Sequence, residues 1–479
     1  MMTSFSWSWS WLAVALLTTM VIGLHGWLYK RKGRGGSASG ARLPGGSDGW
    51  PFIGESLDFI SCSLSSKPES FVDTRRIRYG KVFKTHLFGS RTILSSDAEI
   101  NRFILHSDAN TFVPDYPKSL MELMGKSSIL VCNGALQRRV HGLVGSFLKS
   151  NQLRGQVTSD LVRCMGEAMK GWKDGEVVLI QDQAKSMLFP ILVKGLTGLE
   201  QGNEMQYVRS QFQEFVAGLI SLPIKLPGSQ LYRSLQAKKK IATIIQRIIQ
   251  AKRSDDKGKI PKDAIDILIS DNNDQLNDEL ISDNMVDFMI PAEDSVPVLI
   301  TLIIKYLSEC PLAFRQMEEE NMELKNRKLA LGENLDWTDY LSLSFTQDVI
   351  SESLRMGNII MSTMRKSVRD VEIKGFFIPK GWRVVAYLRS LHLDQENYKD
   401  PYEFCPRRWK EKDINRSSFM PFGGGQRLCP GMDLARLEAA IFLHHLVTNF
   451  TWVAEEDQIL NFPTVRMKGG MPIRVKRKN

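Results

Sequence analysis

Most of the chain beyond residue 55 carries apolar residues at the spacing of an α-helix that buries one face. The clearest of these segments are 207–221, 235–252, 281–309 and 345–357. Two shorter segments, 80–96 and 370–388, instead alternate and turn as β-hairpins do. No internal repeat divides the sequence. We therefore predict one mainly α body with a small β lobe over 55–479, rather than several domains.

The N-terminal segment has a different pattern. Eighteen residues from Trp11 to Leu28 carry no Asp, Glu, Lys or Arg, and as a helix they would be about 27 Å long, close to the roughly 30 Å of a bilayer core. Basic residues follow this span and none precedes it: Lys30, Arg31, Lys32 and Arg34. We predict an uncleaved, single-pass membrane anchor over 1–29 with the body of the protein in the cytoplasm. A cleaved signal peptide is the alternative, but its charged leading region is missing.

A basic segment rich in glycine, serine and proline, residues 30–54, follows the predicted anchor and is expected to act as a hinge. The chain as a whole has 63 Lys and Arg against 53 Asp and Glu, a net charge of +10. This excess suits an anionic membrane surface or an acidic protein partner. No basic arm with interleaved aromatic residues occurs beyond the N-terminus, so we expect no nucleic-acid partner.

The six cysteines are scattered, without a CxxC pair or a tight cluster. This argues against a disulfide scaffold or a structural zinc site and suits a reducing compartment. One of them, Cys429, lies in the unusual stretch PFGGGQRLCPG at 421–431. Glycine permits backbone angles and close approaches that a side chain would block, so this stretch predicts a shaped loop around a single thiol.

Two further signals precede this loop in the last 130 residues. Glu352 and Arg355 lie three apart, on one face of a predicted helix, and Arg408 follows in the extended stretch FCPRRW. Each signal alone has an ordinary explanation, because such pairs are usually solvated and a lone cysteine is usually a small apolar residue. Their order along the chain is the informative feature.

This order of motifs resembles the cytochrome P450 haem-thiolate monooxygenases, and the resemblance covers essentially the whole chain. It implies the cytochrome P450 fold, haem b as cofactor and Cys429 as the axial ligand of the iron. It further implies that Glu352, Arg355 and Arg408 form a buried charge triad.

The resemblance also assigns roles around the cysteine. Arg427 would pair with one haem propionate and Arg365 with the other, while Phe422 would shield the thiolate from water. Gly425 and its neighbouring glycines would let the main chain wrap closely enough to direct N–H groups at the sulfur. A thiolate on iron favours O–O cleavage, and a free thiol has a pKa near 8.5, so the metal and these N–H groups must hold it ionised. The alternative is a glycine-rich turn with an inert cysteine.

The oxygen-activating motif of the family aligns with Pro291 to Ser295. Asp294 and Ser295 keep the acid and alcohol that relay protons, and Glu293 is an additional acid. We interpret Asp294 and Ser295 as a proton relay; the alternative is an acid that satisfies freed backbone groups. Glu293 is a second relay acid, an anchor for a substrate hydroxyl or a surface residue. Two prolines, Pro291 and Pro297, should kink this helix.

A second departure from the family pattern lies at 133–147. Gln137 and His141 stand where Trp or His and then Arg usually hold a haem propionate. One of the neighbours is expected to substitute for this clamp, and Arg139 is our candidate.

Three longer stretches are similar to the plant brassinosteroid-biosynthetic branch, in particular to its sterol C-23 hydroxylases: 221–241, 289–302 and 419–452. This implies NADPH-dependent hydroxylation of a steroid side chain, with electrons from NADPH–cytochrome P450 reductase, at the endoplasmic reticulum membrane. Apolar residues expected to line the substrate site are Phe112, Met121, Met124, Phe215, Leu219, Phe288, Met289, Ile359, Ile360, Met361 and Met467. Alternatives are oxidation at another position such as C-3, rearrangement of a pre-oxidised substrate, or a non-catalytic sterol-binding protein.

Overall fold

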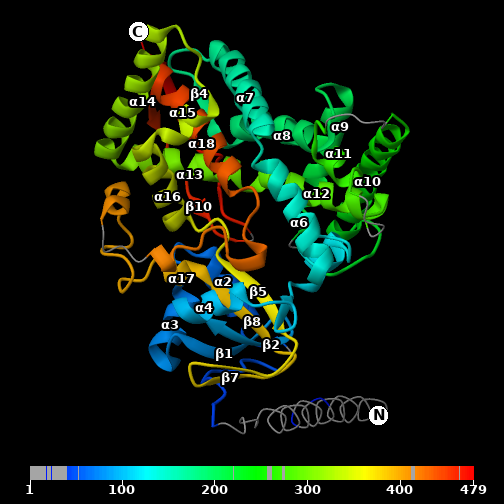
Figure 1. The fold of residues 1–479 in the computed structure, drawn as a ribbon. Helices are drawn as coiled ribbons and strands as arrows, with labels where there is room; N and C mark the ends of the chain where they lie inside the picture. The colour runs from blue at the N-terminus through cyan, green and yellow to red at the C-terminus, as the bar shows by residue number, and fades with distance from the viewer. Residues whose placement is uncertain are drawn as a thin grey trace, which may run out of the picture.

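The computed structural model describes residues 40–478 apart from gaps at 52, 220, 256–260, 272–275, 412–415 and 463, together with the isolated residues Thr18 and Gly23. A large helical body sits on a smaller lobe built around a β-sheet (Figure 1). This arrangement confirms the predicted mainly α fold with a small β lobe.

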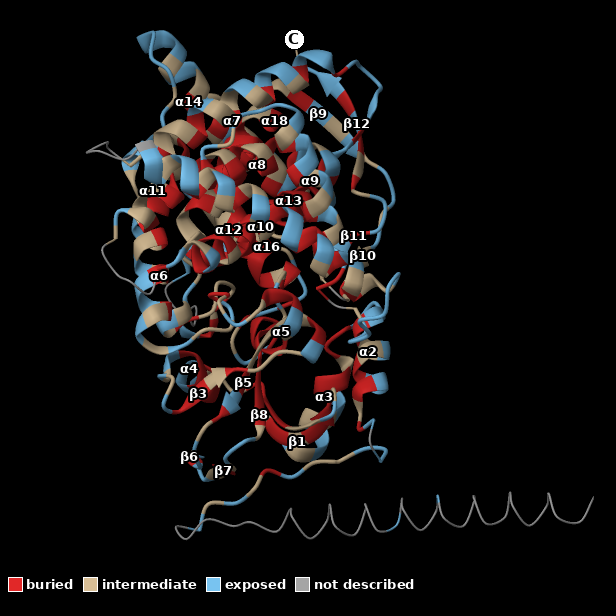
Figure 2. Cartoon of the chain, turned by 90° about the vertical axis from the view of Figure 1, so that its right-hand side faces the viewer, coloured by how far each residue is buried: buried red, intermediate tan, exposed pale blue. Residues whose placement is uncertain are grey.

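The helical body is formed by thirteen of the described α-helices. They are α5 (Lys118–Met124), α6 (Gly134–Leu148), α7 (Asn151–Gly171), α8 (Ile180–Thr197), α9 (Asn203–Val216), α10 (Gln230–Asp255), α11 (Ala264–Ile269), α12 (Asp278–Asp294), α13 (Val296–Glu309), α14 (Pro311–Leu331), α15 (Trp337–Ser342), α16 (Ser344–Gly357) and α18 (Met432–Asn449). Buried residues concentrate on α8, α12, α13 and α16, while the outer helices expose one face (Figure 2). All four predicted helical segments are therefore helical, with shifted ends.

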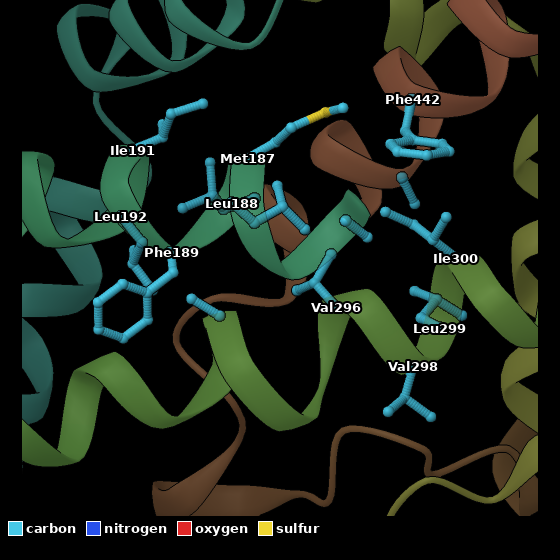
Figure 3. Close-up of a cluster of buried hydrophobic side chains, with 14 of the residues drawn as sticks. Met187, Leu188, Phe189, Ile191, Leu192, Val296, Val298, Leu299, Ile300 and Phe442 are labelled. Carbon is cyan, nitrogen blue, oxygen red and sulfur yellow. The ribbon is translucent and has the colours of Figure 1, made fainter. Parts of the chain in front are cut away.

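The centre of the body is the packing of α8 against α12 and α13. Figure 3 shows side chains of α8 and α13 meeting in one apolar cluster that Phe442 of α18 completes. Because α13 is apolar on nearly every face, it is buried all round, as expected for a central helix. The cluster fixes the position of α12 and α13, and α12 carries the predicted oxygen-side acids at its end.

The prolines interrupt this central helix, as predicted. Helix α12 ends at Asp294 and α13 begins at Val296, with Ser295 at the break (φ −119°, ψ −63°). Pro297 has no N–H to donate to the carbonyl of Glu293, four residues earlier, so the regular hydrogen bonding fails beside the two acids. Pro291 is accommodated inside α12.

The β lobe holds a five-stranded sheet in the order β1-β2-β8-β5-β3. Its strands are β1 (Val82–Leu87), β2 (Ser90–Ser95), β3 (Phe112–Pro114), β5 (Ser362–Ser367) and β8 (Arg383–Tyr387). Helices α2 (Ser56–Leu64), α3 (Ser70–Tyr79), α4 (Ala98–His106) and α17 (Leu388–His392) belong to this lobe (Figure 1). The sheet therefore joins segments from the two ends of the chain.

Both predicted β patches are strands, but only the first is a single hairpin. Strands β1 and β2 pair in antiparallel register across a two-residue turn at Phe88 and Gly89, both with positive φ. The second patch divides: β6 (Val371–Ile373) pairs with β7 (Phe376–Ile378), whereas β8 leaves them and lies parallel to β2. The remaining strands are β4 (Val177–Leu179), β9 (Phe450–Ala454), β10 (Ile459–Leu460), β11 (Arg466–Met467) and β12 (Pro472–Arg477).

The predicted anchor over 1–29 lies outside the described residues, apart from Thr18 and Gly23. The second half of the predicted hinge contacts the β lobe: Arg42 exchanges backbone hydrogen bonds with Gly375 and Phe377, and Gly45 accepts one from Lys84. Within the described ranges, no single helix has the length and apolar character of a membrane span; the segment 278–309 and α14 pass that test only together, with a 116° bend between them.

Candidate functional site

The loop around Cys429 is closed on itself by backbone hydrogen bonds. The N–H of Cys429 donates to the carbonyl of Phe422 (3.0 Å), and the N–H of Gly423 donates to Met420 (3.0 Å). A short 3₁₀ turn, η3 (Gly425–Arg427), lies between them, and α18 begins three residues after the cysteine. The sulfur is thus held between a tight turn and a helix N-terminus.

Gly425 is where this loop approaches α4 most closely. Its φ is +64°, and a Cβ built on it would lie 2.4 Å from the carbonyl oxygen of Leu105 and 2.7 Å from the Cα of His106. Both contacts are with backbone, which has little freedom to move aside. The glycine is therefore required twice, for its positive φ and for the space.

Replacing Gly425 by alanine should push the loop away from α4 and lower both haem retention and stability. An alanine in the left-handed region costs about 1–2 kcal/mol before any clash is counted. Haem content per protein and the midpoint of urea denaturation measure the effect. Gly142→Ala is a suitable control, because a Cβ there meets nothing within 4 Å. Equal behaviour of the two variants would contradict the proposed close packing.

Two arginines meet beside the loop without a carboxylate partner in the described part of the chain. Arg427, on the loop, donates to the carbonyls of Ile129 and Cys132, and Arg365, on β5, donates to the hydroxyl of Tyr116 (3.3 Å). Burial lowers the pKa of Arg427, and the nearby charge of Arg365 lowers it further. Both arginines line a small pocket.

Two partly buried guanidinium groups that repel each other call for an anionic partner, since neither is neutralised by a described acid. The carboxylates of a haem propionate pair have the charge and the planar geometry that arginine binds. The residues present therefore fit the group that the resemblance implies. The structure brings Arg365, Arg427, Gly425, Phe422 and Cys429 to one place.

Burial raises the pKa of the Cys429 thiol, while the N–H of Gly431 opposes that shift. The protein alone thus favours a neutral thiol, and one N–H directed at the sulfur is already in place. A bound metal would supply the remaining stabilisation of the thiolate. Phe422 packs beside the main core, with the guanidinium of Arg436 5.9 Å from its ring centre.

The residues of α6 where a haem-propionate clamp was predicted contact the cysteine loop instead. Gln137 donates to the carbonyl of Gln426 (3.2 Å), and a ring nitrogen of His141 lies 2.7 Å from the carbonyl of Leu428. Arg139 is turned away: it is exposed, and its Nε donates to Asp271 (2.6 Å). Two residues along an α-helix turn by about 200°, so Arg139 points away when Gln137 faces the loop. The structure therefore does not place Arg139 beside the cysteine loop, where the prediction expected it.

The predicted buried triad is confirmed. Glu352 has no exposed surface, and its carboxylate pairs with Arg355 (2.8 Å) and Arg408 (2.9 Å). It accepts five hydrogen bonds in all, two from Arg355, one from Arg408, one from the N–H of Cys405 and one from Trp409. The remaining N–H groups of Arg355 and Arg408 donate to backbone carbonyls of residues between His392 and Glu403. The triad therefore attaches the segment before the cysteine loop to helix α16.

The two acids at the helix break have different surroundings. Glu293 is buried and forms an ion pair with Lys185 of α8 (3.0 Å), so it does not point to the surface. Burial raises the pKa of Asp294, with Lys185 and Arg466 lowering it and Glu293 raising it. Unlike Glu293, Asp294 makes no ion pair within the described ranges. Ser295 follows it at the break.

Sequence reasoning missed two residues of the site. Tyr116 bonds Arg365, and Lys185 pairs with Glu293 across 108 positions of the chain. Neither residue belongs to a local motif, so only the folding of distant segments together reveals them. Among the apolar residues expected at the substrate site, Phe112, Met124, Phe215 and Met289 are buried, whereas Ile360 is 51% exposed.

A thiol in a closed glycine loop, two unneutralised arginines beside it and a buried Glu-Arg-Arg triad define the class of protein. The sequence pattern of the family described as Cytochrome P450 matches residues 44–472. The chain belongs to the cytochrome P450 family and is a monooxygenase of that class. Membership implies a haem iron bound by a cysteine thiolate.

Individual relatives give a closer comparison than the family as a whole. The chain is 65% identical over 443 residues to "Cytochrome P450 90D2" of Oryza sativa subsp. japonica, covering 92% of this chain and 90% of the relative. It is 55% identical to "3-epi-6-deoxocathasterone 23-monooxygenase CYP90D1" of Arabidopsis thaliana, covering 91% and 90%. A solved structure titled "Retinoic acid bound cyanobacterial CYP120A1" matches with a TM-score of 0.79 at 24% identity, covering 91% of this chain and 100% of that chain, which shows the fold alone.

Proposed function

We propose that the protein hydroxylates C-23 of a C-22-hydroxylated brassinosteroid precursor. The observation that carries this proposal is the 55% identity, over nine-tenths of both chains, to a protein named as a 23-monooxygenase of 3-epi-6-deoxocathasterone. The alternatives are oxidation of the same steroids at C-3, rearrangement of a pre-oxidised substrate, and sterol binding without turnover.

Cys429 would hold the haem iron, and Arg427 and Arg365 would hold the propionates. The haem, when bound, supplies the activation of dioxygen. Gly425 brings the loop against α4, and the N–H of Gly431 stabilises negative charge on the sulfur. Phe422 would shield the sulfur from water. Glu352 and its two arginines keep the segment before the loop in place.

Asp294 would deliver protons to the reaction, with Ser295 as the adjoining hydroxyl. Its raised pKa makes the carboxyl group a better proton donor near neutral pH than an exposed aspartate. Glu293 forms an ion pair with Lys185 and so offsets part of its positive charge. Because Lys185 lowers the pKa of Asp294 and Glu293 raises it, this ion pair influences the pKa of the proton-donating acid.

In this proposal, NADPH supplies two electrons through a separate NADPH–cytochrome P450 reductase. One atom of dioxygen enters the C–H bond and the other leaves as water with two protons. The substrate would reach the site from the endoplasmic reticulum membrane, to which the segment 1–29 would anchor the protein. The net charge of +10 suits both an anionic membrane surface and an acidic reductase face.

Reconstitution of the full-length protein with a plant reductase, NADPH and a 22-hydroxylated sterol tests the proposal. We expect a product heavier by one oxygen, with the new hydroxyl located at C-23 by NMR, and NADPH consumed in step with product. A ketone at C-3, a rearranged product formed without NADPH, or tight binding without product would each contradict it. A 22-deoxy sterol is the matched control substrate and should react more slowly.

Changing Asp294 to asparagine should lower kcat by about 10²- to 10⁴-fold, the usual contribution of a positioned proton donor. Substrate affinity should not change, because the side chain keeps its shape. The rate should also become more sensitive to replacing H2O by D2O. Asp278→Asn, at the start of the same helix, is the control. Wild-type turnover by the Asp294 variant would show that protons arrive by another route.

A further inference from the structure

One face of α6 follows the stretch of chain that carries Cys429. Three positions of this helix, each four residues after the last, lie on that face: Gln137, His141 and Gly145. They meet three alternating residues on the two sides of the cysteine: Gln426, Leu428 and Pro430. The helix therefore contacts the cysteine loop at three successive points along its length.

The middle contact acts on the peptide group directly before the cysteine. The Nε2 of His141 lies 2.7 Å from the carbonyl oxygen of Leu428. A carbonyl oxygen only accepts hydrogen bonds, so Nε2 carries a proton and donates it. The N–H of the same peptide group belongs to Cys429 and donates to the carbonyl of Phe422 (3.0 Å). Both polar atoms of this peptide group are therefore bonded, which fixes its plane and the direction in which the cysteine side chain leaves the backbone.

The two outer contacts restrain the same stretch of chain. Gln137 is buried, and its amide donates to the carbonyl of Gln426 (3.2 Å). At Gly145 a built Cβ would lie 3.6 Å from the Cβ of Pro430, which is ordinary van der Waals distance. A methyl group would fit there, but a branched side chain would displace the loop. The helix therefore packs against the residue after the cysteine as well as bonding the residues before it.

The loop in turn holds the chain that leads into α6. The guanidinium of Arg427 donates to three oxygen atoms there: the carbonyls of Ile129 and Cys132 and the Oδ1 of Asn133. Because each segment bonds the other, α6 and the cysteine loop form one unit. A displacement of the helix would therefore be passed on to the sulfur.

This arrangement differs from the one that the family resemblance implies for α6, in which the helix holds a haem propionate. Here His141 and Gln137 donate to loop carbonyls, and Arg139 faces Asp271. Groups that orient a metal ligand from outside its first shell commonly change metal affinity or activity by 10- to 100-fold. The contacts of α6 have the position that such a role requires.

We propose that His141 is a positioning residue for the iron ligand: through the carbonyl of Leu428 it holds the sulfur of Cys429 in place for the haem iron. Gln137 and Gly145 support the same stretch of chain. This inference requires the haem that family membership implies. It does not depend on which steroid the protein oxidises.

Resonance Raman spectroscopy of the full-length holoprotein tests the proposal, because the iron–sulfur stretching band and the propionate bending bands report the two ends of the site separately. His141→Phe keeps an aromatic ring and removes the donor, whereas His141→Gln keeps an N–H donor. Arg138→Leu removes donors from an exposed position of the same helix and is the matched control. The rate of haem loss and the urea midpoint are measured on the same variants.

We expect His141→Phe to shift the iron–sulfur band, to leave the propionate bands unchanged and to lose haem about 10- to 100-fold faster than the wild type. His141→Gln should recover most of both effects, and Arg138→Leu should show neither. The urea midpoint of His141→Phe should change little, because one half-buried hydrogen bond contributes little to global stability.

A second pair of variants tests the packing contact without removing a donor. Gly145→Val should push Pro430 outwards and shift the iron–sulfur band in a protein that keeps both hydrogen bonds from α6. Gly142→Val is its control, because a Cβ at that exposed position meets nothing within 4 Å. This pair decides the question if His141→Phe does not retain haem.

An unchanged iron–sulfur band in His141→Phe would overturn this inference and leave the proposed function intact. Altered propionate bands with an unchanged iron–sulfur band would also overturn it, because His141 would then act on the haem carboxylates. Equal bands in Gly145→Val and Gly142→Val would count against it in the same way. A wild type without any iron–sulfur band would remove both the inference and the assignment of Cys429 as the ligand.

Discussion

Replacing Glu352 by glutamine is expected to lower the free energy of unfolding by about 5 kcal/mol, a large part of the stability of the protein. The change leaves the guanidinium groups of Arg355 and Arg408 buried without a counter-charge. Breaking a buried ion pair in this way costs about 3–5 kcal/mol, against a total stability of about 5–15 kcal/mol for a typical domain. Two cations lose their partner here, so the upper end of that range applies.

Urea denaturation followed by far-UV circular dichroism measures the effect. Glu396→Gln is the matched control, because Glu396 also pairs with two basic residues, Arg76 and Lys81, but its side chain is 64% exposed. Exposed pairs contribute about 0–1 kcal/mol, so the control should unfold close to the wild type. Comparable midpoints for the two variants would mean that the triad does not hold the segment before the cysteine loop.

Replacing Cys429 by serine is expected to abolish monooxygenase activity and the thiolate-type spectrum of the reduced carbonyl complex. The loss should exceed the 10- to 100-fold that outer-shell partners of a metal ligand are worth, because the ligand itself is removed. A serine hydroxyl does not ionise at neutral pH and does not push electron density onto iron as a thiolate does. Absorption spectroscopy and product formation in the reconstituted system measure the two effects.

The control for this variant is Cys164→Ser, on α7, where a half-buried thiol packs against the core. It should keep both the spectrum and the activity. A thiolate spectrum that survives in Cys429→Ser and disappears in another cysteine variant would relocate the iron ligand and invalidate the description of the loop.

Features that short sequence motifs mark could be predicted. Contacts between distant segments that carry no motif could not. The cysteine loop and the Glu352 triad carry their chemistry in short patterns whose order along the chain is informative. The break at Ser295 follows from two prolines. The hairpin pattern of 370–388 does not reveal that β8 leaves this segment and pairs in parallel with β2.

The errors at the site have physical reasons as well. Arg139 was chosen for its charge, although helical phase places Gln137 and His141 towards the loop instead. The ion pair of Glu293 depends on Lys185 of another helix.

Iron-edge X-ray absorption of the purified wild type examines the axial ligand directly. The account predicts a single sulfur neighbour of the haem iron, lost when Cys429 is replaced by serine and kept when Cys164 is. An iron coordinated only by nitrogen and oxygen would contradict it.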